Sequence, residues 1–108
     1  MSRRVVITGV GSINALGNSA REAWGRMLEG ASGIDRITHF DASDYACQIA
    51  AEVKAFDPES VGSRSDVRKL DPFTLFGMAA SQEALADAGM LSGEEVSGFS
   101  PDRAGCIF

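Results

Sequence analysis

Residues 4–11 read Arg-Val-Val-Ile-Thr-Gly-Val-Gly, and this stretch decides which fold the chain is expected to have. Val5, Val6, Ile7 and Val10 make a nearly continuous β-branched run, which is typical of a strand that is buried on both faces of a sheet. A glycine-rich loop follows. The stretch therefore predicts a buried strand over 4–11.

A helix over about residues 20–29 is predicted next. Ser19 and Glu22 have the spacing of a capping box, in which the Ser hydroxyl accepts from the Glu amide and the carboxylate reaches back. Apolar residues then recur at helical spacing, and Gly30 suits the left-handed position after the last turn. Trp24 lies on the apolar face of this helix, so we expect it in the core.

Two more strands and a long helix are predicted downstream. Alternation of apolar and polar residues over 49–55 indicates a half-exposed strand. Asp71 and Pro72 are suited to begin a helix that ends at Gly89, and its many small residues predict close packing among other elements. The apolar run 104–108 indicates a third strand. This alternation of strands and helices predicts an α/β layered fold with right-handed crossovers.

Composition excludes several classes of protein. The chain has 108 residues, of which 44% are hydrophobic and 23% charged, as in an ordinary soluble globular domain. Ten Lys and Arg against fifteen Asp and Glu give a net charge of −5, which disfavours general binding to nucleic acid or anionic membranes. No run approaches the roughly 18 apolar residues of a membrane span, and no signal-peptide pattern is evident. The expected location is the cytoplasm.

The end of the sequence suggests that the chain is a fragment. Residues 104–108 form an apolar run with no polar turn after it, although a strand needs partners for its backbone and side chains. Three strands are also few for a layered α/β fold. We therefore expect residues 1–108 to be part of a longer protein that is cut within a strand.

Gly9-Val10-Gly11 resembles the start of a dinucleotide-binding fingerprint, because it lies between a strand and a helix. The fingerprint requires a third glycine at the sixth position, where this chain has Asn14. A small nucleotide-binding domain is therefore a minor alternative. The glycines more simply permit close packing of the backbone.

Arg64, Arg68 and Lys69 form a basic cluster in an acidic chain. If the stretch is helical, Arg64 and Arg68 share one face with Lys69 beside them, and Asp66 only partly offsets their charge. The cluster could be an ordinary solvated surface. It could also attract a specific anionic partner.

The remaining reactive side chains do not form a complete active site. Cys47 and Cys106 are far apart, have no histidine beside them and are expected to be small buried hydrophobic residues. His39, the single histidine, lies in a predicted loop over 31–47 and is expected to form local hydrogen bonds. The carboxylates have no metal-ligand spacing, so neither a metal site nor a redox site is predicted.

Several stretches, taken in order, resemble the N-terminal part of a β-ketoacyl-[acyl carrier protein] synthase of the type II elongating class. The similarity covers essentially the whole chain. The matching stretches are Arg3-Arg4-Val5-Val6-Ile7-Thr8-Gly9-Val10-Gly11, Gly17-Asn18, Trp24, Gly30-Ala31-Ser32-Gly33-Ile34, His39-Phe40-Asp41, Arg68-Lys69-Leu70-Asp71-Pro72-Phe73 and Arg103-Ala104-Gly105-Cys106-Ile107.

The resemblance implies a thiolase-like fold with αβαβα layers, usually in a homodimer, of which residues 1–108 would be the first part of the N-terminal half. It implies decarboxylative Claisen condensation of malonyl-[acyl carrier protein] with an enzyme-bound acyl thioester, in fatty acid biosynthesis. The family's catalytic Cys and two His would lie downstream of this chain. We therefore assign no catalytic residue here and expect the 108 residues alone to be inactive.

The resemblance also implies that acyl carrier protein docks on Arg64, Arg68 and Lys69. Ser65 stands where related sequences often carry a further lysine. No resident cofactor is expected, because 4′-phosphopantetheine arrives on the carrier protein. The alternatives are a polyketide ketosynthase and a fragment that binds carrier protein without catalysis.

Overall fold

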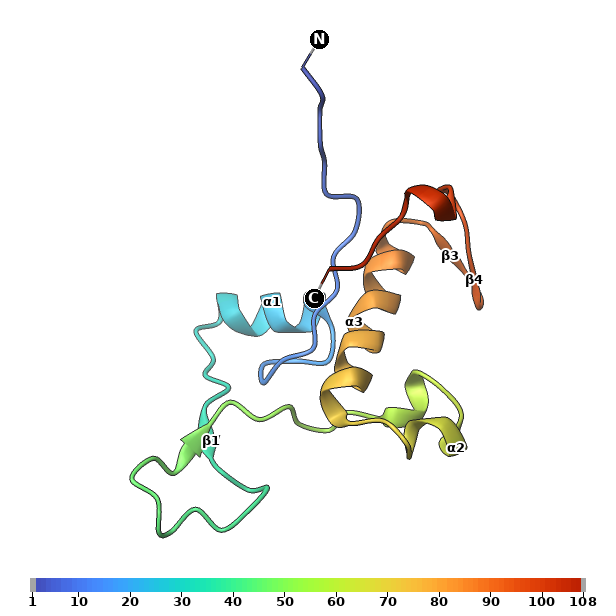
Figure 1. Ribbon diagram of the computed structural model, residues 1–108. Coiled ribbons are helices and arrows are strands. Elements are labelled where there is room, and N and C mark those ends of the chain that lie inside the picture. Colours follow the sequence, from blue (N-terminus) through green and yellow to red (C-terminus); the bar gives the residue numbers. More distant parts are fainter. Residues whose placement is uncertain (1, 108) are drawn as a thin grey trace.

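The computed structural model of the protein describes residues 2–107, which form three helices and two short antiparallel strand pairs (Figure 1). The helices are α1 (Ala20–Leu28), α2 (Arg64–Val67) and α3 (Pro72–Asp87). The strands are β1 (Asp35–Arg36), β2 (Ile49–Ala50), β3 (Leu91–Ser92) and β4 (Glu95–Val96), and the 3₁₀ turns are η1 (Pro58–Ser60) and η2 (Pro101–Arg103).

The two strand pairs are separate from each other. β1 pairs with β2 so that Asp35 lies opposite Ala50, and β3 pairs with β4 so that Leu91 lies opposite Val96. Figure 1 shows α3 in the middle, with α1 beside it, α2 near its N-terminal end and the β3–β4 hairpin at its C-terminal end. α1, α2 and the β3–β4 hairpin thus adjoin α3, whereas the β1–β2 pair lies apart from it (Figure 1).

The predicted first helix is confirmed as α1. Ser19 Oγ accepts from the amide of Glu22 at 3.1 Å, and Gly30 has the left-handed backbone conformation with φ +71°. The Glu22 carboxylate accepts from the amide of Asn18 at 2.9 Å, one residue before the expected position. The two side chains therefore accept hydrogen bonds from backbone amides that have no partner within the helix at its start.

The predicted long helix is also confirmed, as α3. It begins at Pro72, whose missing N–H costs no hydrogen bond in the first turn, and Gly89 follows its end with φ +69°. Asp71 has the extended backbone of an N-cap, but its side chain makes no capping hydrogen bond.

One face of α3 packs directly against the glycines of the N-terminal segment. A Cβ on Gly11 would overlap the Ala80 carbonyl and lie 2.9 Å from the amide nitrogen of Ala84. A Cβ on Gly9 would overlap the Ala84 carbonyl and lie 2.8 Å from the Ala88 nitrogen. The interpretation that these glycines permit close backbone packing is confirmed, and small residues on the facing helix complete the contact.

Two carboxylates on α3 hold the same segment by its backbone. Asp87 accepts from the amide of Val10 at 3.0 Å. Glu83 accepts from the amides of Ser12 and Ala20, each at 2.9 Å. Glu83 therefore ties both the N-terminal segment and the first turn of α1 to α3, and its negative charge lies at the favourable end of the α1 dipole.

The prediction of a strand over 4–11 is wrong for the described residues. Residues 4–8 are extended and project from the rest of the molecule (Figure 1), with Val5 and Ile7 92% and 86% exposed, whereas Gly9 and Gly11 lie against α3. A strand requires hydrogen bonds to a neighbouring strand. Here the amide of Val10 is bound by the side chain of Asp87 instead.

The other strand predictions are also largely wrong for residues 2–107. Only Ile49–Ala50 of the predicted 49–55 strand is paired, and its partner β1 lies in the stretch predicted as a loop. Residues 104–107 form no strand, and Phe108 lies outside the described residues. Three strands therefore do not come together, and the layers of the expected α/β fold do not appear in this part of the chain.

The buried core is small and lies beneath α2. Val61, Val67 and Leu75 are buried together, with Phe56 and Ala79 packed against them, and the Phe56 ring meets Phe76 edge-on with centroids 5.0 Å apart. The single tryptophan, expected in the core, is 60% exposed.

The overall dimensions agree with a small core. The radius of gyration is 17.1 Å, against about 13 Å expected for a compact domain of this length. The accessible surface is 8862 Å², against about 5,800 Å² for a folded monomer of this mass. Most apolar side chains are therefore not covered by residues 2–107.

Replacing Gly11 by Ala tests the close contact with α3. The added methyl would overlap the Ala80 carbonyl, so we expect the free energy of unfolding of the full protein to fall by about 1–3 kcal/mol. Urea denaturation measures the change. Gly25→Ala is the matched control, because a Cβ there meets nothing within 4 Å and the helix should gain about 0.5–1 kcal/mol. Equal effects of the two substitutions would contradict the contact.

Candidate functional site

The basic cluster, Arg64, Arg68 and Lys69, lies on and just after α2. Val67 on this helix is buried against Val61 and Leu75, so the helix is anchored by one apolar side chain. Arg68 is the C-cap residue, and the turn continues because the Lys69 amide donates to the Asp66 carbonyl at 3.1 Å. All three cationic residues are exposed.

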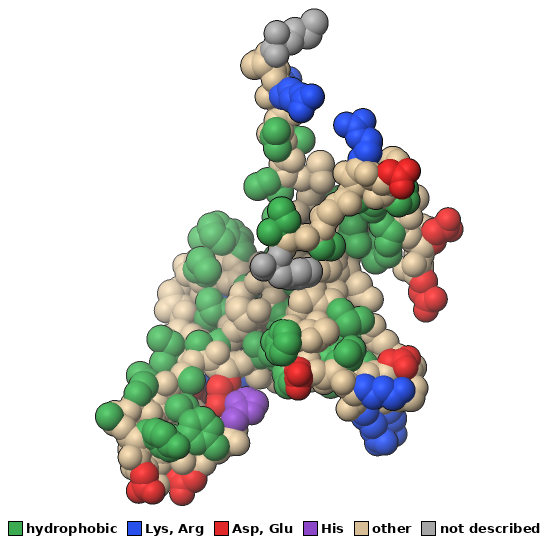
Figure 2. All heavy atoms as spheres, in the orientation of Figure 1, with side chains coloured by type: hydrophobic (Ala, Val, Ile, Leu, Met, Phe, Trp, Pro, Cys, Tyr) green, Lys and Arg blue, Asp and Glu red, His purple; other side chains and the backbone are tan. Residues whose placement is uncertain are grey.

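The structure brings the three cations to one edge of the molecule, as the helical spacing predicted. Figure 2 shows Lys and Arg side chains gathered at the lower right, over the region where Figure 1 places α2. The docking role of these residues stays a prediction, but their exposure and common placement are compatible with it.

The cluster is less uniformly basic than the sequence suggested. Arg64 Nε lies 3.3 Å from Glu59 Oε1, on η1. Asp66 accepts a hydrogen bond from the hydroxyl of Ser63. Arg68 and Lys69 form no ion pair with any residue in the range 2–107. Two of the three cations therefore remain available to an anionic partner.

The two cysteines do not occupy the environments predicted for them. Both Cys47 and Cys106 are exposed free thiols, so the expectation that they are buried hydrophobic residues is wrong. Cys47 Sγ lies 3.5 Å from the carbonyl of Ile49, which is a local contact at the start of β2. Nothing in their surroundings marks either thiol as a nucleophile.

His39 lies in the β1–β2 loop, with its Nε2 3.8 Å from Glu52 Oε1. The same carboxylate accepts from the amide of Thr38 at 3.0 Å, from its hydroxyl at 2.8 Å and from the amide of His39 at 3.3 Å. These hydrogen bonds, first of all the one from the Thr38 side chain, hold the pKa of Glu52 below its ordinary value. His39 thus belongs to this local hydrogen-bonded structure through its backbone amide, and its imidazole makes no hydrogen bond with the residues that the structure describes.

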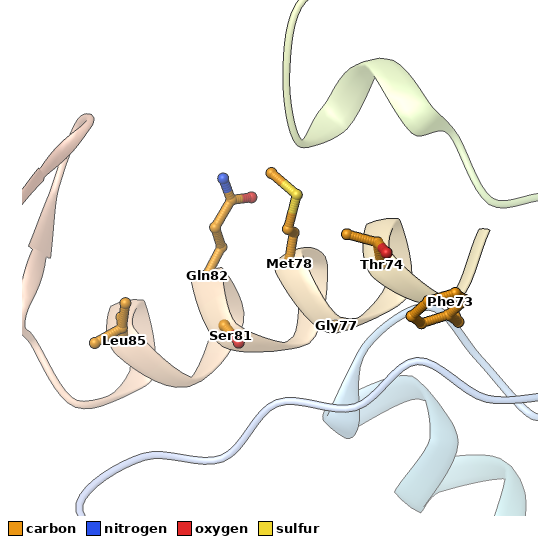
Figure 3. Close-up of a pocket in the computed structure, with 7 residues that line it drawn as sticks. All are labelled: Phe73, Thr74, Gly77, Met78, Ser81, Gln82 and Leu85. Carbon is orange, nitrogen blue, oxygen red and sulfur yellow. The ribbon is translucent and has the colours of Figure 1, made fainter. Parts of the chain in front are cut away.

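An open groove of about 610 Å³ runs along α3, and sequence reasoning missed it (Figure 3). The helix was predicted to pack among other elements, and in residues 2–107 its alanine face and the side chains of Leu75 and Phe76 do so, while this side stays open. Figure 3 shows Met78 and Gln82 pointing away from the helix on this open side, with Phe73 at the end where the helix begins. Its lining consists of Phe73, Thr74, Gly77, Met78, Ser81, Gln82 and Leu85.

The groove contains no side chain that could act as a general acid or base. No titratable side chain lines it. Among the described residues, no three His, Cys, Asp or Glu side chains lie where they could hold a metal ion. Residues 2–107 therefore present a charged surface and an apolar face, and neither forms a catalytic constellation.

Comparison with known proteins identifies the family. The sequence model for the N-terminal domain of beta-ketoacyl synthases matches residues 2–107. Three curated relatives are each named 3-oxoacyl-[acyl-carrier-protein] synthase 2. That of Synechocystis is 42% identical over 85% of this chain, that of Coxiella burnetii 47% over 82%, and that of Vibrio cholerae 43% over 86%.

The chain belongs to the β-ketoacyl synthase family, in its N-terminal domain. Membership of this family implies a thiolase-like fold, and it confirms the resemblance drawn from the motifs. The chain spans only 21–22% of the length of these three relatives. None of the helices in residues 2–107 is long and apolar enough to cross a membrane.

The hydrogen bonds to Glu52 predict a pH dependence of the β1–β2 loop. The lowered pKa means that the carboxylate stabilises the loop above the ordinary Glu pKa, and this stabilisation is lost as the pH falls through the lower folded-state pKa. Replacing Thr38 by Val removes the hydroxyl donor and should move the pKa of Glu52 back toward its ordinary value. NMR titration of the Glu52 carboxyl carbon measures the shift, and an unchanged pKa would contradict this cause.

Proposed function

We propose that the chain is part of a condensing enzyme that elongates fatty acids on acyl carrier protein. The observation that carries this proposal is the match of residues 2–107 to the beta-ketoacyl synthase N-terminal domain, supported by relatives named 3-oxoacyl-[acyl-carrier-protein] synthase 2. The enzyme is a cytoplasmic homodimer of the layered αβαβα type, and residues 1–108 belong to the first half of each subunit.

The reaction is a decarboxylative Claisen condensation. The malonyl group on carrier protein loses CO₂, and the resulting carbanion attacks the carbonyl carbon of an acyl thioester held by the enzyme. A carbon–carbon bond forms, the enzyme thiolate leaves, and 3-oxoacyl-[acyl carrier protein] is released. The catalytic Cys and two His lie outside residues 1–108, so Cys47, Cys106 and His39 have no part in this chemistry. The 108 residues alone are inactive.

Within this reaction the present residues serve as scaffold and as a docking surface. Arg64, Arg68 and Lys69 attract the acidic carrier protein, which brings the substrate on its own 4′-phosphopantetheine arm, so the enzyme needs no resident cofactor. Exposed charges of this kind are screened over about 8 Å at physiological salt, so they act on encounter and orientation. The support is their common exposure on and after α2.

Charge reversal tests the docking surface. Replacing Arg64, Arg68 and Lys69 together by Glu in the full protein should weaken binding of holo-acyl carrier protein by about tenfold or more at low salt, mainly through slower association. Surface plasmon resonance at about 20 mM salt measures both rates.

The matched control changes the net charge equally elsewhere. Arg21, Arg36 and Arg103 are exposed and lie outside the α2 region, so their joint replacement by Glu should reduce association much less. If the cluster variant and the control bind carrier protein alike, docking on Arg64, Arg68 and Lys69 is wrong.

A further inference from the structure

The segment 57–71, which carries the basic cluster, also carries more carboxylates than cations. Its three cationic side chains are accompanied by those of Asp57, Glu59, Asp66 and Asp71. An anionic partner therefore does not meet a simple positive patch. The charge that the partner encounters depends on which of these carboxylates already have a hydrogen-bond or ion-pair partner within the segment.

Each carboxylate has a different role in the structure. Asp57 caps η1, because its side chain accepts from the amide of Glu59 at 2.9 Å. Asp66 is bound by the hydroxyl of Ser63. Asp71 makes no side-chain capping bond. Glu59 alone among them forms an ion pair with a member of the basic cluster, at 3.3 Å from Arg64.

The backbone holds Glu59 in place beside α2. The η1 turn is closed by the Val61 amide, which donates to the Pro58 carbonyl at 3.3 Å, and by the Ser60 hydroxyl, which donates to the Asp57 carbonyl at 2.6 Å. Val61 is buried in the same apolar cluster that anchors α2. η1 and α2 share this apolar cluster, so they hold Glu59 and Arg64 next to each other.

The ion pair is exposed and therefore exchangeable. The Arg64 side chain is 72% exposed and that of Glu59 56% exposed. Exposed pairs of this kind contribute little and are weakened by salt, so a carboxylate of a partner can take the place of Glu59.

We propose that Glu59 is an internal competitor of the docking partner: it occupies Arg64 in the free protein, so that Arg68 and Lys69 make the first contact. Arg64 joins the interface only when a carboxylate of the partner displaces Glu59. This rests on the proposed docking of an acidic carrier protein, and it adds a residue that lowers the affinity of that site.

Replacing Glu59 by Gln tests the proposal. The substitution keeps the shape of the side chain and frees Arg64, so the affinity of the full protein for holo-acyl carrier protein should rise by about 1.5- to 5-fold at 20 mM salt. Isothermal titration calorimetry measures the dissociation constant. Glu29→Gln is the control, since Glu29 is an exposed carboxylate at the end of α1 and its replacement changes the net charge equally.

A second substitution separates competition from a general charge effect. Arg64→Gln should weaken binding less than Arg68→Gln or Lys69→Gln while Glu59 is present. In the Glu59→Gln background, Arg64→Gln should instead remove the whole gain in affinity. In 1 M salt the difference between Glu59→Gln and the wild-type protein should disappear.

The outcomes distinguish a failure of this proposal from a failure of the docking hypothesis on which it rests. If reversal of the whole cluster weakens binding but Glu59→Gln behaves like Glu29→Gln, Glu59 is no competitor. A gain that persists when Arg64 is also Gln overturns the proposal as well. If cluster reversal has no effect, the docking site itself is wrong.

Discussion

The contact between the N-terminal segment and one face of α3 is the constraint on which the rest of this structure depends. Gly9 and Gly11 lie so close to the helix that added side chains would overlap its carbonyl groups. Glu83 and Asp87 fix the same approach by accepting backbone amides from that segment. Close packing and charged hydrogen bonds act at one place, so the segment is held in a single position along α3.

Glu83 extends this constraint to α1. Its carboxylate accepts from the amide of Ser12 and also from that of Ala20, the first residue of α1. One side chain on α3 thereby sets where α1 begins relative to the glycine-rich loop. Because such amides are costly to leave unpaired, the start of α1 is tied to α3 even though few apolar side chains are buried between them.

The placement of the basic cluster follows from a different and smaller set of contacts. Val67 buries its side chain against Val61 and Leu75, which fixes α2 near the beginning of α3. The cationic residues on and just after α2 are then exposed, where they meet either solvent or Glu59. The same apolar cluster therefore positions both the proposed docking residues and the carboxylate proposed to compete with their partner.

The sequence by itself determined α1 and α3, because capping residues, prolines and glycines act within a few residues of the helix ends. It also determined the family, through motifs spread over the whole chain. It predicted strands over 4–11 and 49–55 from β-branched and alternating residues. A strand, however, is completed by a neighbour distant in the chain, so local pattern cannot establish that it is paired.

Only the tertiary structure decided which side chains meet. It placed Glu83 on the amides of Ser12 and Ala20, and Glu59 on Arg64, although no local signal distinguishes these carboxylates from their neighbours. It also left Trp24 exposed, because covering an apolar helix face requires another element to lie against it. Long-range hydrogen bonds and ion pairs depend on where the backbone brings two distant segments together, and the amino-acid pattern of either segment alone does not contain that information.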